Sequence, residues 1–365
     1  MKNRNPFNRL RWILITALLS LTILSACVQN KGSSSDALAP KTYRGELSED
    51  QFATLSSLKK VDDYPLYTMN YYGEYNQPVS SSNIELQVTP IISEAAQLPF
   101  ARPWGCSLFT TLNGSDDMIF GRNFDYYYSP ALLLFTSPPT GYASISMVDL
   151  AVVGYWWSFT ARSIINRPVI KRKALLKTPL VPFDGMNEKG LVIGMAAVPP
   201  GRVKPDPRKQ TIGQLMVMRK ILDTCSSVNE ALAVFRAYNI DMQHGLPLHY
   251  LIADLSGDSV LVEFYDGKMV ITRNDKPWHS ATNFLIAAVG QSAVGKCKRY
   301  DRINQRLNEV KGHLTMQDAM DLLVDVSARK TQWSIVYGIN TGDIKVGMGR
   351  NYKNLYRFHL NIGND

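Results

Sequence analysis

The chain has 365 residues, a formal net charge of +9 and four cysteines. This length is enough for one large core or two modest domains. Four basic residues near the start carry +4 of the charge, and the remaining excess of about +5 is spread along the chain. That distribution excludes the clustered basic patch of a nucleic-acid-binding protein. The five histidines and four cysteines lack the spacing of a metal site, so we predict no metal.

The N-terminus has the pattern of an export leader. The four basic residues precede an apolar run, 12–24, which is short for a membrane span. The tetrapeptide Leu24-Ser25-Ala26-Cys27 resembles a bacterial lipobox, and Val28 follows the cysteine. We therefore predict a signal peptide over 1–26, lipidation at Cys27 and a flexible tether over 27–45. The predicted location is the bacterial cell envelope, at the outer membrane if the cell is Gram-negative. The alternative is an uncleaved transmembrane anchor.

Residues 46–105 form a separable leading segment. Ser48 and Gln51 have the spacing of a capping box, which predicts a short helix through Leu58. The tyrosine-rich stretch after it alternates like one or two strands. Pro99 and Pro103 argue against a regular element leading into the next segment.

The stretch from Gly105 to Asp125 concentrates the candidate chemistry. Two short apolar runs flank an Asn-Gly turn, a pattern that predicts a β-hairpin. The hairpin would bring Arg122 and Asp125 back toward Cys106. A thiol, a permanent cation and a carboxylate would then share one neighbourhood, as a nucleophilic thiolate requires. The alternative is an ordinary buried cysteine beside a surface ion pair.

The rest of the chain alternates strands with helix pairs. The aromatic tract 126–157 reads mainly as sheet core and loop, although some of its rings could line an apolar substrate pocket. Patterning predicts helices within 211–238 and from Thr315, turns over 161–190, and strands over 142–153, 191–198, 249–254, 259–264, 269–272 and within 331–360. This order predicts an α+β fold in layers. Whether Cys225 pairs with Cys297 is left open.

Five stretches, taken in order, resemble the choloylglycine hydrolase family, which includes conjugated bile acid hydrolases and penicillin V acylases. They read GCS…FGRNFD, DGMNEKGLVIGMAAVPPG, HYLIADLSGDSVLVEF, SATNF and CKRYDRIN. The resemblance covers essentially all of 106–360. It implies a four-layer αββα N-terminal nucleophile hydrolase sandwich of two antiparallel sheets, with no cofactor.

The resemblance also implies a mechanism in which the nucleophile supplies its own base. Cys106 matches the family nucleophile, whose α-amine, with a pKa of roughly 8, accepts the thiol proton. Because Cys106 is internal, that amine must be released. The Gly105–Cys106 junction resembles the self-cleaving acid ceramidase and isopenicillin N acyltransferase branch. We therefore predict cleavage there, which separates the leading segment from a catalytic domain over 106–365.

Four further roles come from the resemblance alone. Asp125 would orient the amine, and Arg122 would favour the thiolate by its charge. Asn283 matches the oxyanion-hole asparagine and Arg299 a late arginine of the charge network. Ala197 replaces an asparagine that is frequent in bile acid hydrolases, where the position either donates a backbone N–H or contacts substrate.

The predicted function is hydrolysis of a linear N-acyl amide through a thioester on Cys106. Conjugated bile acids, penicillin V, N-acyl amino acids, acyl homoserine lactones and N-acylethanolamines all fit as substrates. The predicted partners are this small molecule and the membrane that holds the lipid anchor, with a homo-oligomer as an option. Three alternatives are acyl transfer on the same scaffold, a non-catalytic lipid- or peptide-binding envelope lipoprotein, and a papain-like protease using His249 or His279.

Overall fold

A computed structural model describes residues 46–75, 105–113, 118–156, 158–201, 203–242 and 246–363. The predicted leader, Cys27 and its tether, the proline-containing stretch 76–104 and most of the Asn-Gly turn lie outside these residues. Every described residue belongs to one unit, 42–365. Among the described residues, no helix has both the length and the apolar character needed to cross a bilayer.

The predicted hairpin forms the middle of a six-stranded antiparallel sheet. Strand β3 pairs with β4 so that Ser107 lies opposite Asn123, and β15 continues the sheet on the other edge of β4. The order is β14-β3-β4-β15-β16-β17. The bounds are β3 Ser107–Thr111, β4 Ile119–Asp125, β14 Trp278–Ala281, β15 Thr331–Gly338, β16 Asp343–Met348 and β17 Leu355–His359.

A nine-stranded sheet forms the second layer, in the order β1-β2-β5-β6-β7-β8-β11-β12-β13. Its pairs are antiparallel except β2 with β5, which is parallel. The bounds are β1 Lys59–Asp62, β2 Leu66–Tyr71, β5 Ala131–Thr136, β6 Ser144–Asp149, β7 Asp184–Asn187, β8 Val192–Ala197, β11 Leu248–Ala253, β12 Ser259–Tyr265 and β13 Lys268–Arg273.

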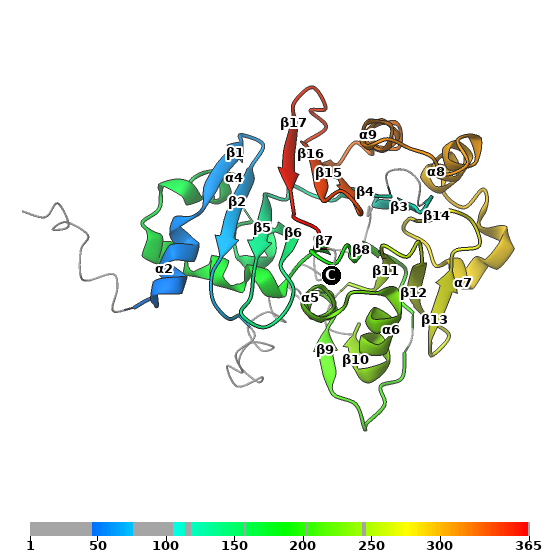
Figure 1. Ribbon diagram of the computed structural model, residues 1–365, viewed down its shortest axis with the longest axis horizontal. Helices are drawn as coiled ribbons and strands as arrows, with labels where there is room; N and C mark the ends of the chain where they lie inside the picture. Colours follow the sequence, from blue (N-terminus) through cyan, green and yellow to red (C-terminus); the bar gives the residue numbers. More distant parts are fainter. Residues whose placement is uncertain are drawn as a thin grey trace, which may run out of the picture. The chain divides into compact units, whose positions relative to one another are not determined.

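The two sheets pack face to face between helices, as Figure 1 shows. Alternating side chains of the hairpin pack in two different cores. Leu108 and Phe120 belong to the core between the sheets. Phe109 and Ile119 belong to a second core under α8 (Lys298–Glu309) and α9 (Met316–Asp325). Helix α5 (Met216–Thr224) contacts β7 and β8 on the other side, and α6 (Val228–Ala237) packs on α5. The period of two in the strands therefore produces the predicted α+β layers.

Local signals located the starts of three helices. Ser48 and Gln51 form the predicted capping box of α2 (Glu49–Ser56), and Thr315 with Asp318 forms that of α9. Ser227 caps α6, but the Glu230 carboxylate accepts from Ser226 instead of closing the box. The remaining helices are α4 Ser158–Arg162, α7 Ile286–Val289 and the 3-10 helices η1 Leu150–Val153, η2 Ile164–Asn166, η3 Val169–Leu180 and η4 Gly290–Ala293.

Three predicted elements need correction. The predicted turn at 183–190 begins as strand β7, because Asp184–Asn187 pairs with both β6 and β8. The predicted strand 142–153 ends at Asp149, whose carboxylate accepts the Ala151 N–H and starts η1. The start of the predicted helical stretch 211–238 is strand β9 (Thr211–Gly213), which pairs in parallel with β10 (Asn239–Asp241).

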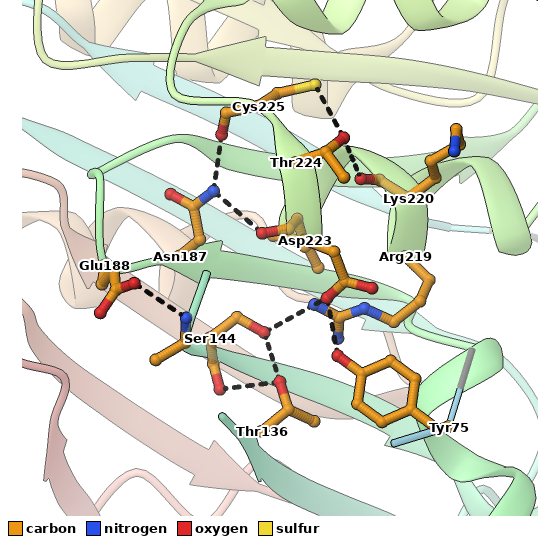
Figure 2. A network of polar contacts seen from close by, with 12 residues as sticks. Tyr75, Thr136, Ser144, Asn187, Glu188, Arg219, Lys220, Asp223, Thr224 and Cys225 are labelled. Atoms are coloured by element: carbon orange, nitrogen blue, oxygen red, sulfur yellow. Dashed lines mark hydrogen bonds and ion pairs between the residues drawn. The ribbon is translucent and has the colours of Figure 1, made fainter. Parts of the chain in front are cut away.

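The leading segment is integrated into the nine-stranded sheet. Its strand β2 lies beside β5, and its Tyr75 hydroxyl donates to Asp223 Oδ1 at 2.7 Å. Asp223 is also paired with Arg219 at 2.6 Å, and Arg219 donates to Ser144 Oγ at 2.8 Å. Figure 2 shows this polar cluster, in which the Tyr75 hydroxyl and the Arg219 guanidinium both point toward Asp223. All four of these side chains are buried. The segment is therefore held by buried polar contacts as well as by strand pairing.

Candidate active site

Cys106 lies at the point where the leading segment enters the six-stranded sheet. It is fully buried, and it immediately precedes β3. Gly105 N–H donates to the Asp125 carbonyl at 3.4 Å, so the end of β4 lies beside the Gly105–Cys106 peptide bond. A Cβ atom on Gly105 would lie 2.8 Å from Asp125 Oδ2 and 2.9 Å from its Cβ. Only glycine allows this carboxylate to approach the backbone so closely.

The Asp125 carboxylate is buried and only half satisfied. Its Oδ1 accepts from the Thr331 hydroxyl at 2.5 Å, whereas Oδ2 has no partner among the described residues. Burial raises the pKa of Asp125 to about 6, although the Thr331 hydrogen bond and the charges of Arg299 and Arg122 act in the opposite direction. The free oxygen adjoins Gly105 and can accept a nearby N–H.

Arg122 is buried in the core and contacts Asp184. Its guanidinium donates to the Asp184 carboxylate and to the Phe183 carbonyl, the latter at 2.7 Å. Leu108, two residues after Cys106, lies opposite Arg122, so strand alternation places Cys106 and Arg122 on the same face. The described contacts of Arg122 therefore show a buried ion pair near the thiol and not the surface ion pair of the alternative reading.

Asp184 was not singled out from the sequence. Besides Arg122 it accepts hydrogen bonds from the Tyr337 hydroxyl at 2.5 Å and Trp333 Nε1 at 3.5 Å. It opens the DGMNEKG stretch, which carried the family resemblance. Its buried charge is compensated across the two sheets, since it lies on β7 and Arg122 on β4. This ion pair connects the nine-stranded sheet to the nucleophile hairpin.

Arg299, Asn283 and Ala197 form a second chain of polar contacts, which ends at the Gly105–Cys106 backbone. Arg299 donates to the Gly105 carbonyl at 2.5 Å, to the Cys106 carbonyl and to Ser107 Oγ at 3.0 Å. It also donates to Asn283 Oδ1 at 3.1 Å. Asn283 Nδ2 donates to the Ala197 carbonyl at 2.7 Å, so this position contributes a backbone oxygen. An amide NH₂ has two N–H groups, which leaves Asn283 one further donor.

The other cysteines and the aromatic tract were also considered as site features in the sequence, and no described contact places them with Cys106. Cys106, Cys225 and Cys297 are free thiols, so the possible bridge between the last two is not formed. A pocket of about 920 Å³ lies between the 200–211 segment, the end of α6 and β13, with Phe235, Phe264 and Met269 in its lining. The predicted catalytic residues do not line it, nor do the aromatic residues of 126–156. Tyr127 of that tract is exposed, whereas Phe135 and Tyr155 pack in or against the core.

Two face-to-face sheets enclosed by helices form the sandwich of the N-terminal nucleophile hydrolase fold. A mutant conjugated bile acid hydrolase from Clostridium perfringens superimposes with a TM-score of 0.51 at 17% identity, covering 71% of this chain and 93% of that one. A penicillin V acylase from Agrobacterium tumefaciens gives a TM-score of 0.48 at 15% identity, covering 70% and 86%. The first comparison confirms the predicted fold.

The family model described as linear amide C-N hydrolases, choloylglycine hydrolase family, matches residues 106–283. A penicillin V acylase from Pectobacterium atrosepticum is 30% identical over 138 residues. That match spans 35% of this chain and 35% of the acylase, about a third of its length. Residues 106–283, just under half of the chain, are therefore similar to this family of linear amide C-N hydrolases. The family resemblance predicted from the sequence is confirmed over these residues.

Proposed function

We propose that this protein hydrolyses linear N-acyl amides with Cys106 as the nucleophile, after cutting its own chain between Gly105 and Cys106. The observation that carries the proposal is the convergence of polar groups on that one peptide bond. Arg299 donates to its carbonyl oxygen, and the unpartnered oxygen of Asp125 adjoins Gly105. The family match also begins at Cys106 itself, with the leading segment outside it.

Self-cleavage starts with attack of the Cys106 sulfur on the Gly105 carbonyl carbon. The bond to the Cys106 nitrogen breaks, that nitrogen takes the thiol proton, and a thioester joins Gly105 to the sulfur. Arg299 is placed to stabilise the negative charge that develops on the Gly105 oxygen. Water then hydrolyses the thioester, which leaves a Gly105 carboxylate and a Cys106 with a free thiol and a free amine. The new amine can donate to Asp125 Oδ2.

Turnover repeats the same chemistry on a substrate amide. The α-amine accepts the thiol proton, and the sulfur attacks the acyl carbonyl. The second N–H of Asn283 stabilises the oxyanion while its first remains on the Ala197 carbonyl. The leaving amine takes the proton, and water releases the acid from the thioester. No step requires a metal or a cofactor. Acyl transfer to an amine would differ only in the final acceptor.

The leading segment stays with the catalytic domain after cleavage in this account. Supporting contacts are the parallel pairing of β2 with β5 and the buried hydrogen bond from Tyr75 to Asp223. Pulling β2 away would expose an edge of β5 and leave Asp223 and Arg219 without Tyr75 in a buried site. The product is thus one unit of two chains, tethered to the envelope through a lipid on Cys27.

A substrate panel tests the activity. Purified protein is incubated with a conjugated bile acid, penicillin V, an N-acyl homoserine lactone and an N-acylethanolamine, and released amine is measured. We expect turnover of at least one member, loss of turnover in Cys106→Ala, and retention in Cys225→Ala, which removes another buried thiol. An acyl mass added to the peptide beginning at Cys106 would identify the thioester. Unchanged turnover in Cys106→Ala would refute the proposal.

A further inference from the structure

A buried histidine and glutamate lie beneath the segment that carries Asn283. His249 is on β11 and Glu263 on the adjacent β12, and both side chains are fully buried. His249 Nδ1 lies 3.1 Å from Glu263 Oε1, which makes the imidazole the donor to the carboxylate. The other ring nitrogen, Nε2, is buried and has no partner among the described residues. Among the described residues, Glu263 is therefore the hydrogen-bond partner of the His249 side chain.

The Glu263 carboxylate also holds the backbone just after Asn283. Its Oε1 accepts the Ile286 N–H at 2.9 Å, and its Oε2 accepts the Ala287 N–H at 2.7 Å. These two residues start α7, three and four positions beyond Asn283. A buried carboxylate with three donors is a strong and directional anchor for a short segment. Both oxygens are used, so neither is free for solvent or substrate.

These contacts close a ring around the proposed oxyanion donor. The strand register places His249 directly opposite Ala196, the neighbour of Ala197. The Ala197 carbonyl accepts from Asn283 Nδ2 at 2.7 Å. A continuous chain of contacts therefore leads from β8 through His249 and Glu263 to the start of α7. From there the backbone leads back to Asn283, which contacts β8. One end of the Asn283 segment is thus tied to β8 and the other to β12, and both of these strands pair with β11.

We infer that Glu263, supported by His249, is a positioning residue that fixes Asn283 for oxyanion stabilisation. This inference rests on the proposed function. Neither side chain contacts the thiol, and their effect on the reaction passes through the Asn283 segment. Removing an oxyanion donor outright costs roughly 100- to 1,000-fold in kcat. Loosening the segment that aims the donor should cost part of that factor, because small displacements already weaken such contacts.

The test is Glu263→Gln, alone and combined with Asn283→Ala. Glutamine keeps the shape but replaces one accepting oxygen with an NH₂ group that faces a backbone N–H. We expect kcat to fall by about ten-fold or more, with KM changed by less than about three-fold, because the lost interaction matters mainly in the transition state. In the Asn283→Ala background, the same substitution should change kcat by less than about two-fold. Additive losses would overturn the inference.

Glu230→Gln is the matched control. Glu230 also accepts a backbone N–H, from Ser226 at 2.6 Å, but on the surface at α6. It should leave kcat unchanged.

Hydrogen exchange gives a readout that does not depend on turnover. In Glu263→Gln the amides of Ile286 and Ala287 should exchange at least ten-fold faster, while those of β3 and β4 keep their protection. Unchanged exchange at both amides would overturn the inference even if no amide substrate is found. Wild-type protein without turnover, but with the expected exchange, would instead refute the proposed function alone.

Discussion

Asp125→Asn, made in an uncut Cys106→Ala chain, tests the electrostatics of the site directly. The pKa of Asp125 is raised from 3.8 to about 6, because burial outweighs the Thr331 hydrogen bond and the charges of Arg299 and Arg122. A folded pKa above the unfolded one means that the folded chain holds a proton that the unfolded chain releases between about pH 4 and pH 6. The stabilisation is therefore complete below pH 4 and is lost as the pH rises through 6.

The difference of about two pKa units corresponds to about 3 kcal/mol. Asparagine does not ionise, so we expect the stability of the chain that keeps Asp125, relative to its Asp125→Asn variant, to fall by about this amount between pH 4 and pH 7. Urea unfolding of both chains at four pH values measures it, and their difference cancels other titrating groups such as Asp149. A constant difference would show that the carboxylate has the same pKa in both states, and a difference that grows with pH would show that folding lowers its pKa. Either result would refute the reasoning.

Three further predictions concern the junction and the leading segment. Gly105→Ala should slow self-cleavage at least ten-fold, because the added carbon would lie 2.8 Å from Asp125 Oδ2, and a gel time course after refolding would detect it. Arg299→Lys keeps the charge but loses the planar guanidinium, so the rate of self-cleavage in the same assay should fall about ten-fold. Cleavage at the normal rate would contradict this prediction. Tyr75→Phe removes a buried hydrogen bond to Asp223 and should lower the free energy of unfolding by about 1–3 kcal/mol; unchanged urea unfolding would argue against the contact.

Local patterns were sufficient to predict the part of the fold that holds the junction. An Asn-Gly pair between two apolar runs predicts a hairpin, and β3 pairs with β4 as predicted. That register places Gly105 beside Asp125. The capping boxes of α2 and α9 could be read from residues three positions apart, since their hydrogen bonds are local.

Long-range partners could not be read from the sequence. The partner of Arg122 is Asp184, 62 positions away, and this pairing exists only because β7 packs across from β4. The parallel pairing of β2 with β5 likewise depends on how the leading segment returns to the sheet. Neither contact has a local signature.

Around Asn283 and Arg299, too, the sequence identified some of the residues and missed others. The family resemblance picked out both residues. The structure places them in contact with each other, and Arg299 also donates to the Gly105 carbonyl. The family resemblance gave no reason to choose Glu263, which contacts the Asn283 segment only through backbone N–H groups. A carboxylate in an apolar strand was the one available signal, because such a group must find donors when buried.

The most direct test of the central claim is N-terminal mapping of the purified chain by intact mass and peptide sequencing. The account predicts a large fragment that begins at Cys106, bound to a smaller fragment that ends at Gly105, and a single uncut chain in Cys106→Ala. A wild-type chain that stays uncut while it hydrolyses amides at full rate would contradict it.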